Sequence, residues 1–260
     1  PVPQFSANLG FLFTEHSLPD AIRAAADAGF NAVECHWPYD VPPSAVAKAL
    51  QDTGLPMLGL NTVRGEGIHG GFGLSAVPGA EDVARAAIDQ AFDYADAIDA
   101  KAVHVMAGKT SAEGAEETFR ANLNYACDRA GKSGRTVLIE PINQISTPGY
   151  FLHQTAQAAS LITSLQRPEL RLMFDCFHVG MNGEDVPARL KALLPLIGHI
   201  QFASVPDRKS PDQGTLDYPS LFDLIDALGW SRPLGAEYLP DGSTNASLGW
   251  MSSHNNTPKT

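Results

Sequence analysis

The chain lacks the features that mark membrane proteins and nucleic-acid-binding proteins. Its 260 residues contain no run of about 18 apolar residues, so we expect no transmembrane helix. The chain contains 18 Lys and Arg and 29 Asp and Glu, which gives a net charge of −11, and no basic run is longer than Arg208-Lys209. Because such a surface repels phosphate backbones and anionic lipids, we expect binding to neither nucleic acid nor membrane.

Cysteine is also scarce. Cys35, Cys127 and Cys176 are odd in number, scattered, and form no CxxC pair. The first residues, Pro-Val-Pro-Gln-Phe-Ser, lack the basic and apolar regions of a signal peptide. Both observations favour reduced thiols in a cytoplasmic protein.

No linker or low-complexity stretch divides the chain, and strand-like runs alternate with helical patterns throughout. Strands are predicted at residues 4–8, 32–34, 57–61, 102–106, 136–140, 172–175, 199–201 and 234–237. Helices are predicted at 19–28, 43–50, 81–98, 113–130, 154–165, 186–194 and 218–228. An eighth helix, at 243–250, is short.

Prolines and glycines at the predicted helix ends support these boundaries. Pro19 and Pro43 stand near predicted helix starts, where proline is well tolerated. Glycines that suit a left-handed helix stop follow four of the helices: Gly29, Gly54, Gly131 and Gly229.

Eight strands alternating with helices predict a single α/β domain, a (β/α)8 TIM barrel over residues 1–251. Residues 252–260 are predicted to be a disordered tail. The alternative fold is a doubly wound open sheet, which is expected to have a G-x-G-x-x-G turn after its first strand. The sequence following Asn8 contains no such motif.

Polar residues end the predicted strands, where a barrel carries its active site. They are Asn8, Glu34, Asn61, His104, Glu140, Asp175, Gln201 and Glu237. The last four stand about 26 to 36 residues apart, close to one strand-plus-helix unit of ~30 residues. We therefore expect these four side chains to converge on one point.

The chemistry of this set indicates a metal. Three carboxylates and one amide oxygen suit Mg²⁺ or Mn²⁺, whereas Zn²⁺ prefers His and Cys. An interior salt-bridge network is the alternative, but the four runs end without Arg or Lys. Glu140 and Glu237, on strands five and eight, can face each other across a substrate. They then suit proton transfer at adjacent carbons, while a metal-activated water for hydrolysis is the other use of such a site.

The chain resembles the hydroxypyruvate isomerase family along almost its whole length, from Asn8 to about Trp250. The most specific stretch is the E-P-I-N…P-G-Y-F-L pattern that begins at Glu140. Further matching segments begin at His104, Phe174, Gly198, Pro206, Asp217 and Glu237. That family belongs to the xylose-isomerase-like barrels, with 2-oxo-tetronate isomerases, ketose epimerases and endonuclease IV.

The resemblance implies a divalent metal held by Glu140, Asp175, Gln201 and Glu237, with Glu140 and Glu237 as acid and base. It also implies that His178 and Arg208 contact a small anionic sugar-acid substrate. Without the resemblance, His178 reads as a loop histidine on the barrel rim and Arg208 as a solvated surface charge. The glycine-rich segment 64–73 is expected to close over the site.

Three departures from the family leave the substrate open. Ala80 replaces an arginine, Thr215 a glutamate, and Lys209-Ser210 a His-Glu pair. Isomerisation of hydroxypyruvate is the favoured reaction, and isomerisation of a 2-oxo-tetronate comes second. Epimerisation of a ketose at C3 comes third, because epimerases of this group usually carry His where Gln201 stands. An endonuclease IV-type nuclease would need more His ligands and a basic face, and a non-catalytic sugar-acid-binding protein would not need two glutamates. Homo-oligomer formation stays open.

Overall fold

A computed structural model describes residues 3–65, 67 and 71–255 of the chain. The strands are β1 (Phe5–Asn8), β2 (Ala32–Glu34), β3 (Gly59–Asn61), β4 (Ala102–His104), β5 (Thr136–Ile139), β6 (Leu170–Asp175), β7 (Ile197–Phe202) and β8 (Leu234–Ala236). The helices are α1 (Leu18–Asp27), α2 (Pro43–Thr53), α3 (Glu81–Ile98), α4 (Ala115–Ser133), α5 (Thr155–Leu165), α6 (Cys176–Met181), α7 (Val186–Leu193), α8 (Tyr218–Ala227) and α9 (Gly249–Asn255).

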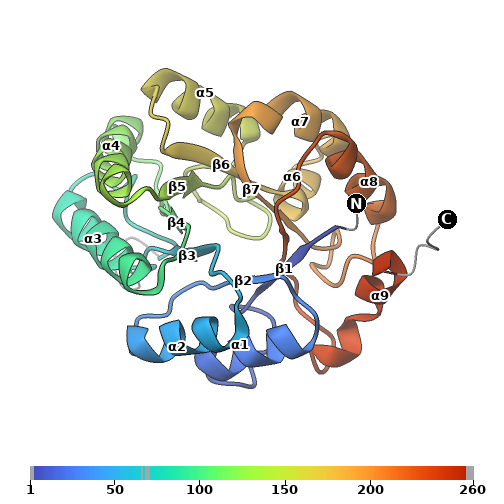
Figure 1. The fold of residues 1–260 in the computed structure, drawn as a ribbon. Coiled ribbons are helices and arrows are strands. Elements are labelled where there is room, and N and C mark those ends of the chain that lie inside the picture. Colours follow the sequence, from blue (N-terminus) through green and yellow to red (C-terminus); the bar gives the residue numbers. More distant parts are fainter. Residues whose placement is uncertain (1–2, 66, 68–70, 256–260) are drawn as a thin grey trace.

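The eight strands are parallel and form a barrel inside a ring of helices (Figure 1). They pair in the order β2-β1-β8-β7-β6-β5-β4-β3. The two end strands also meet, because Val33 bridges to Met57 and Leu58 N donates to Val33 O at 2.8 Å. The predicted (β/α)8 barrel is therefore confirmed.

The structure corrects two details of the helix prediction. Gly131 does not end α4: it lies inside that helix, and Gly134, with φ of 70°, ends it. The short helix α6 was not predicted. It begins directly after Asp175, whose Oδ1 caps it by accepting a hydrogen bond from Phe177 N at 2.9 Å.

The C-terminal region also differs from the prediction. A 3-10 turn (Asn245–Ser247) and α9 stand in place of one helix at 243–250. The segment predicted as a disordered tail begins inside α9, and residues 256–260 lie outside the described part of the chain.

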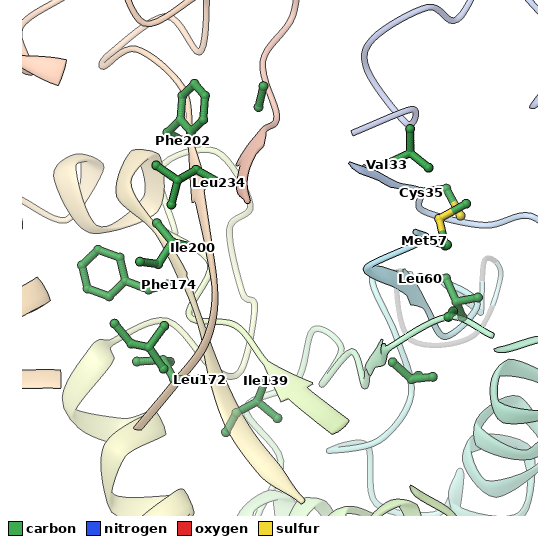
Figure 2. Close-up of a cluster of buried hydrophobic side chains, with 14 of the residues drawn as sticks. Val33, Cys35, Met57, Leu60, Ile139, Leu172, Phe174, Ile200, Phe202 and Leu234 are labelled. Atoms are coloured by element: carbon green, nitrogen blue, oxygen red, sulfur yellow. The ribbon is translucent and has the colours of Figure 1, made fainter. Parts of the chain in front are cut away.

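Side chains alternate between the two faces of each strand, which gives the barrel two different surfaces. One set points outward and packs beneath the helices, and it includes Phe174, Ile200 and Phe202 (Figure 2). Their neighbours in sequence point inward, where Met173 belongs to a small separate apolar cluster. The inward positions nearest the C-terminal ends of the strands are polar.

Phe202 joins several elements on the outer face of the sheet. Its ring centroid lies 5.8 Å from that of Phe5, 5.2 Å from Phe222 and 5.4 Å from Trp250, each in edge-to-face geometry. Since aromatic pairs prefer this arrangement, the cluster fixes α8 and α9 against β1 and β7.

Within the described residues, no helix combines the length and the apolar character needed to cross a bilayer. All three cysteines are free thiols, in line with the sequence prediction, and all three are buried.

Candidate active site

The four predicted metal ligands lie together at the C-terminal end of the barrel strands. Asp175 ends β6, Gln201 lies in β7, and Glu140 and Glu237 directly follow β5 and β8. All four are buried, with exposed fractions from 2% to 6%. Gln201 Nε2 lies 3.2 Å from Glu237 Oε2, while Arg208 Nη2 lies 2.9 Å from Glu237 Oε1 and 3.9 Å from Asp175 Oδ2. The strand-end residues are thus neighbours in space.

Three of the four side chains have a buried oxygen with no hydrogen-bond partner in the described structure. These atoms are Glu140 Oε2, Asp175 Oδ2 and Gln201 Oε1. A buried acceptor without a donor is costly, typically by about 1 to 3 kcal/mol for each group. A cation is the simplest partner for such oxygens, so the chemistry of these residues fits the oxygen-ligand set of a hard divalent metal.

One grouping of three residues, which includes the predicted ligands Glu140 and Asp175 but not Glu237, could hold a metal. Ligating atoms of Glu140, Asp175 and His178 all lie within 4.8 Å of one another, and the three residues are buried. The imidazole of His178 has its Nε2 3.7 Å from Asp175 Oδ2.

The proton on His178 can be assigned from its surroundings. Its Nδ1 accepts a hydrogen bond from Asn143 N at 3.2 Å, and the Asn143 side-chain amide lies 2.7 Å away. Burial, with the charge of Arg208, holds the pKa of His178 well below its usual range, so the ring is neutral. A neutral ring that accepts at Nδ1 carries its proton at Nε2, so in this tautomer His178 donates toward the site and offers no lone pair to a metal.

The two glutamates that were predicted as acid and base have opposite environments. Burial raises the pKa of Glu140 well above 4.5, and repulsion from Glu237 and Asp175 raises it further. Burial acts in the same direction on Glu237, but the hydrogen bond from His36 and the charge of Arg208 lower its pKa to about 2. Without a metal, the pKa of Glu140 is thus raised and that of Glu237 lowered, so a proton is held more readily at Glu140, a division typical of acid–base pairs.

Glu237 is held by a full set of donors. Its Oε2 accepts from Asn8 Nδ2 at 2.7 Å and contacts His36 Nε2 at 3.1 Å. Its Oε1 accepts from Arg208. The sequence analysis placed Asn8 at a strand end without a role and missed His36. The sequence signal for His36 was its position two residues after Glu34, because residues two apart on a strand share a face and Glu34 points into the barrel.

Arg208 is fixed by its surroundings and is not a solvated surface charge. Its guanidinium carbon lies 4.8 Å from the ring centroid of Phe11 and 4.7 Å from that of Phe177. Its backbone is in the left-handed region, with φ of 57°. With Nη2 bonded to Glu237 and Nε without a partner, the guanidinium can still bind another anion.

These groups surround a cavity of about 330 Å³. Glu140, Glu237, His178 and Arg208 all line it. Its wall also contains His36 and Trp37, which the sequence analysis did not select, and Arg64 and Phe72 from the glycine-rich segment 64–73. Of the glycine-rich segment predicted to close over the site, residues 66 and 68–70 lie outside the described part of the chain.

A family model described as a xylose isomerase-like TIM barrel matches residues 22–254. The chain belongs to this family.

Relatives within the family match nearly the whole chain. A 2-oxo-tetronate isomerase of Cupriavidus necator is 39% identical, and the match covers 96% of this chain and 98% of that one. A protein of Danio rerio, provisionally named hydroxypyruvate isomerase, is also 39% identical, with 95% and 94% covered. These names confirm the family resemblance and the prediction of an isomerase.

A solved structure from Brucella melitensis, named AP endonuclease, family 2, is also similar. It is 35% identical, with a TM-score of 0.92 that covers 96% of this chain and 98% of that chain. The family barrel is therefore the same in both.

Proposed function

We propose that the chain is a divalent-metal-dependent isomerase that interconverts the keto and aldehyde forms of a short sugar acid. The reaction is of the type that converts hydroxypyruvate to tartronate semialdehyde through an enediolate. The observation that carries this proposal is that Glu140 and Glu237 line one cavity together with His178 and Arg208, while Glu140 and Asp175 each keep a buried oxygen without a hydrogen-bond partner in the described structure.

The metal would be held by Glu140, Asp175, Gln201 and Glu237. Their oxygen-only donor set favours Mg²⁺ or Mn²⁺. When bound, the ion would stabilise negative charge on the substrate oxygens.

The two glutamates carry the proton transfer. In the direction from hydroxypyruvate, ionised Glu237 removes a proton from the hydroxyl-bearing carbon, and the electron pair moves toward the neighbouring carbonyl. Glu140 returns a proton to that neighbouring carbon. The original hydroxyl passes its proton to the former carbonyl oxygen, so the first becomes the aldehyde oxygen and the second the new hydroxyl, and proton exchange with solvent restores both glutamates. In the reverse direction the two residues exchange roles.

Two further residues bind and orient the substrate. His178 Nε2–H donates to an oxygen of the reacting carbons. Arg208 receives the substrate carboxylate with the N–H groups that Glu237 leaves unused, and its ring platform of Phe11 and Phe177 holds it in place.

A four-carbon 2-oxo acid is the second candidate substrate. The 330 Å³ cavity has room beyond a three-carbon acid, because pockets of about 300 to 1,000 Å³ enclose much larger ligands. A second guanidinium, that of Arg64, also lines it and lies 4.1 Å from the Phe72 ring centroid. Arg64 follows β3 and Arg208 follows β7, which stand on opposite sides of the barrel.

The test is proton NMR in D₂O with Mg²⁺, using hydroxypyruvate and 2-oxo-tetronate separately. We expect conversion of at least one acid, with solvent deuterium at the newly protonated carbon. Parallel samples hold D-fructose and a duplex with an abasic site. Turnover of neither acid, together with epimerised ketose or cleaved DNA, would overturn the proposal.

A further inference from the structure

Glu34, at the end of β2, is a buried carboxylate that the proposed reaction does not use. It is 3% exposed and is not among the described residues that line the 330 Å³ cavity. It lines instead a separate cavity of about 20 Å³ together with His199 and Gln201. A substrate in the larger cavity therefore does not reach it.

Its carboxylate is nevertheless surrounded by polar groups. Oε1 accepts from Gln201 Nε2 at 2.7 Å and from Asn8 Nδ2 at 3.3 Å. Oε2 accepts from Ser6 Oγ at 2.9 Å and lies 2.8 Å from His199 Nε2. Burial alone would raise the pKa of Glu34, but the charge of His199 and its hydrogen bond bring that pKa below 4.5. Glu34 is therefore ionised.

This carboxylate fixes which way the Gln201 amide points. The nitrogen end of the amide lies between two carboxylate oxygens, 2.7 Å from Glu34 and 3.2 Å from Glu237. Only an NH₂ group can donate to both, so the amide oxygen must point away from them. That oxygen is Gln201 Oε1, which is buried and without a partner in the described structure.

The contact also depends on an open space in β8. Gly235 pairs with Gln201, and a Cβ at Gly235 would stand 2.6 and 2.8 Å from the two Glu34 oxygens and 2.9 Å from Gln201 Cγ. The backbone φ of Gly235 is one that other residues adopt, so the lack of room for a side chain explains the glycine at this position. Glu34 thus reaches from β2 to β7 across β1 and β8 only because Gly235 has no side chain.

We infer that Glu34 is a positioning residue, which holds Gln201 so that its amide oxygen points into the candidate metal site. The inference rests on the proposed function in that it takes Gln201 as a metal ligand. In E34Q, an amide replaces one acceptor by a donor, so the Gln201 amide can turn over and withdraw its oxygen.

The test is Mn²⁺ binding to the whole chain, followed by electron paramagnetic resonance without substrate. We expect E34Q to weaken Mn²⁺ binding by about 10- to 100-fold, the usual effect of losing a group that orients a ligand. E184Q is the matched control, because Glu184 accepts a hydrogen bond from Thr155 Oγ1 at 2.7 Å outside the site. It should bind Mn²⁺ as the unaltered chain does.

A double-mutant cycle separates positioning from a general loss of structure. In the Q201A background, E34Q should have no further effect on Mn²⁺ affinity, even where it lowers the melting temperature. The inference would be overturned if E34Q weakened Mn²⁺ binding equally in the unaltered chain and in the Q201A chain. It would also be overturned if the single variant Q201A bound Mn²⁺ as tightly as the unaltered chain.

If E34Q does not fold, G235A serves instead. This variant keeps every hydrogen-bonding group but displaces Glu34, so it should weaken Mn²⁺ binding only where residue 201 is glutamine. Tight Mn²⁺ binding that follows this pattern without turnover would leave the inference standing and the proposed isomerase wrong.

Discussion

Arg208 donates a hydrogen bond from Nη2 to Glu237 Oε1 at 2.9 Å. The residue expected to bind substrate is therefore tied to one of the two proposed proton-transfer groups. Its positive charge also contributes to the low pKa of Glu237. Substrate binding and the ionisation of the base consequently share one guanidinium.

Replacing Arg208 should impair binding more than turnover. A hydrogen bond to a charged group contributes about 1.5 to 3 kcal/mol, so R208A should raise KM by at least about tenfold. kcat should fall to a smaller extent, because Glu237 keeps its other donors. R208K should recover only part of the loss, since a point charge lacks the bidentate geometry. Steady-state kinetics measures both constants, and an unchanged KM in R208A would show that the carboxylate binds elsewhere.

Glutamine at either proton-transfer position keeps the shape but removes the base. E140Q and E237Q should each lower kcat by ~10²-fold or more. The double variant should be little worse than either single one, because the two groups act as a unit. Additive losses would show that the two groups act independently. Full retention of a substrate deuterium in ordinary water would instead indicate a metal-assisted hydride shift with the glutamates as ligands only.

Chelation should abolish activity, and added Mg²⁺ or Mn²⁺ should restore it. Activity after exhaustive chelation, with residual metal measured by mass spectrometry, would contradict the metal requirement.

Metal binding should depend steeply on pH. In the metal-free chain burial raises the pKa of Asp175 to about 7, and the pKa of Glu140 is also raised. Metal binding must then release protons, so Mn²⁺ affinity should rise between about pH 5 and 7, by about tenfold per pH unit for each proton released. Titration calorimetry in two buffers of different ionisation enthalpy counts these protons, and an affinity independent of pH would contradict the prediction.

The same raised pKa values have a consequence for stability. Between the unfolded value of 3.8 and the folded value of about 7, folded Asp175 binds more protons than unfolded Asp175. This group therefore stabilises the metal-free chain below about pH 4, and the contribution is lost as the pH rises through 7. Urea denaturation should show this slope without metal and a weaker one with saturating Mg²⁺.

Phe202 should dominate the stability of the outer aromatic cluster. F202A should lower the free energy of unfolding by about 3 to 5 kcal/mol, through lost burial and the cavity left among Phe5, Phe222 and Trp250. For a chain of this size the melting temperature should fall by on the order of 10 °C. F202L fills more of the space and should cost less. A loss below about 1 kcal/mol in F202A would mean that the neighbouring rings repack.

The barrel and the identity of the strand-end residues follow from the order of residues in the chain. Apolar runs of period two and helical patterns between them fix which segments become strands and helices, because both periods follow from backbone geometry. In a parallel sheet, all the C-terminal strand ends lie at one end of the barrel. The convergence of Glu140 and Glu237 was therefore predictable from spacing alone. The start of α6 was also readable in principle, since Asp175 is a good helix cap.

The partner of each of these residues depends on how the folded chain brings distant segments together. His36 and Glu237 stand 201 positions apart in the chain, and Glu34 and Gln201 stand 167 apart. Closure of the barrel brings each pair within about 3 Å, the range in which hydrogen bonds form. No local pattern carries that distance, and the protonation of Glu237 and the direction of the Gln201 amide both depend on it.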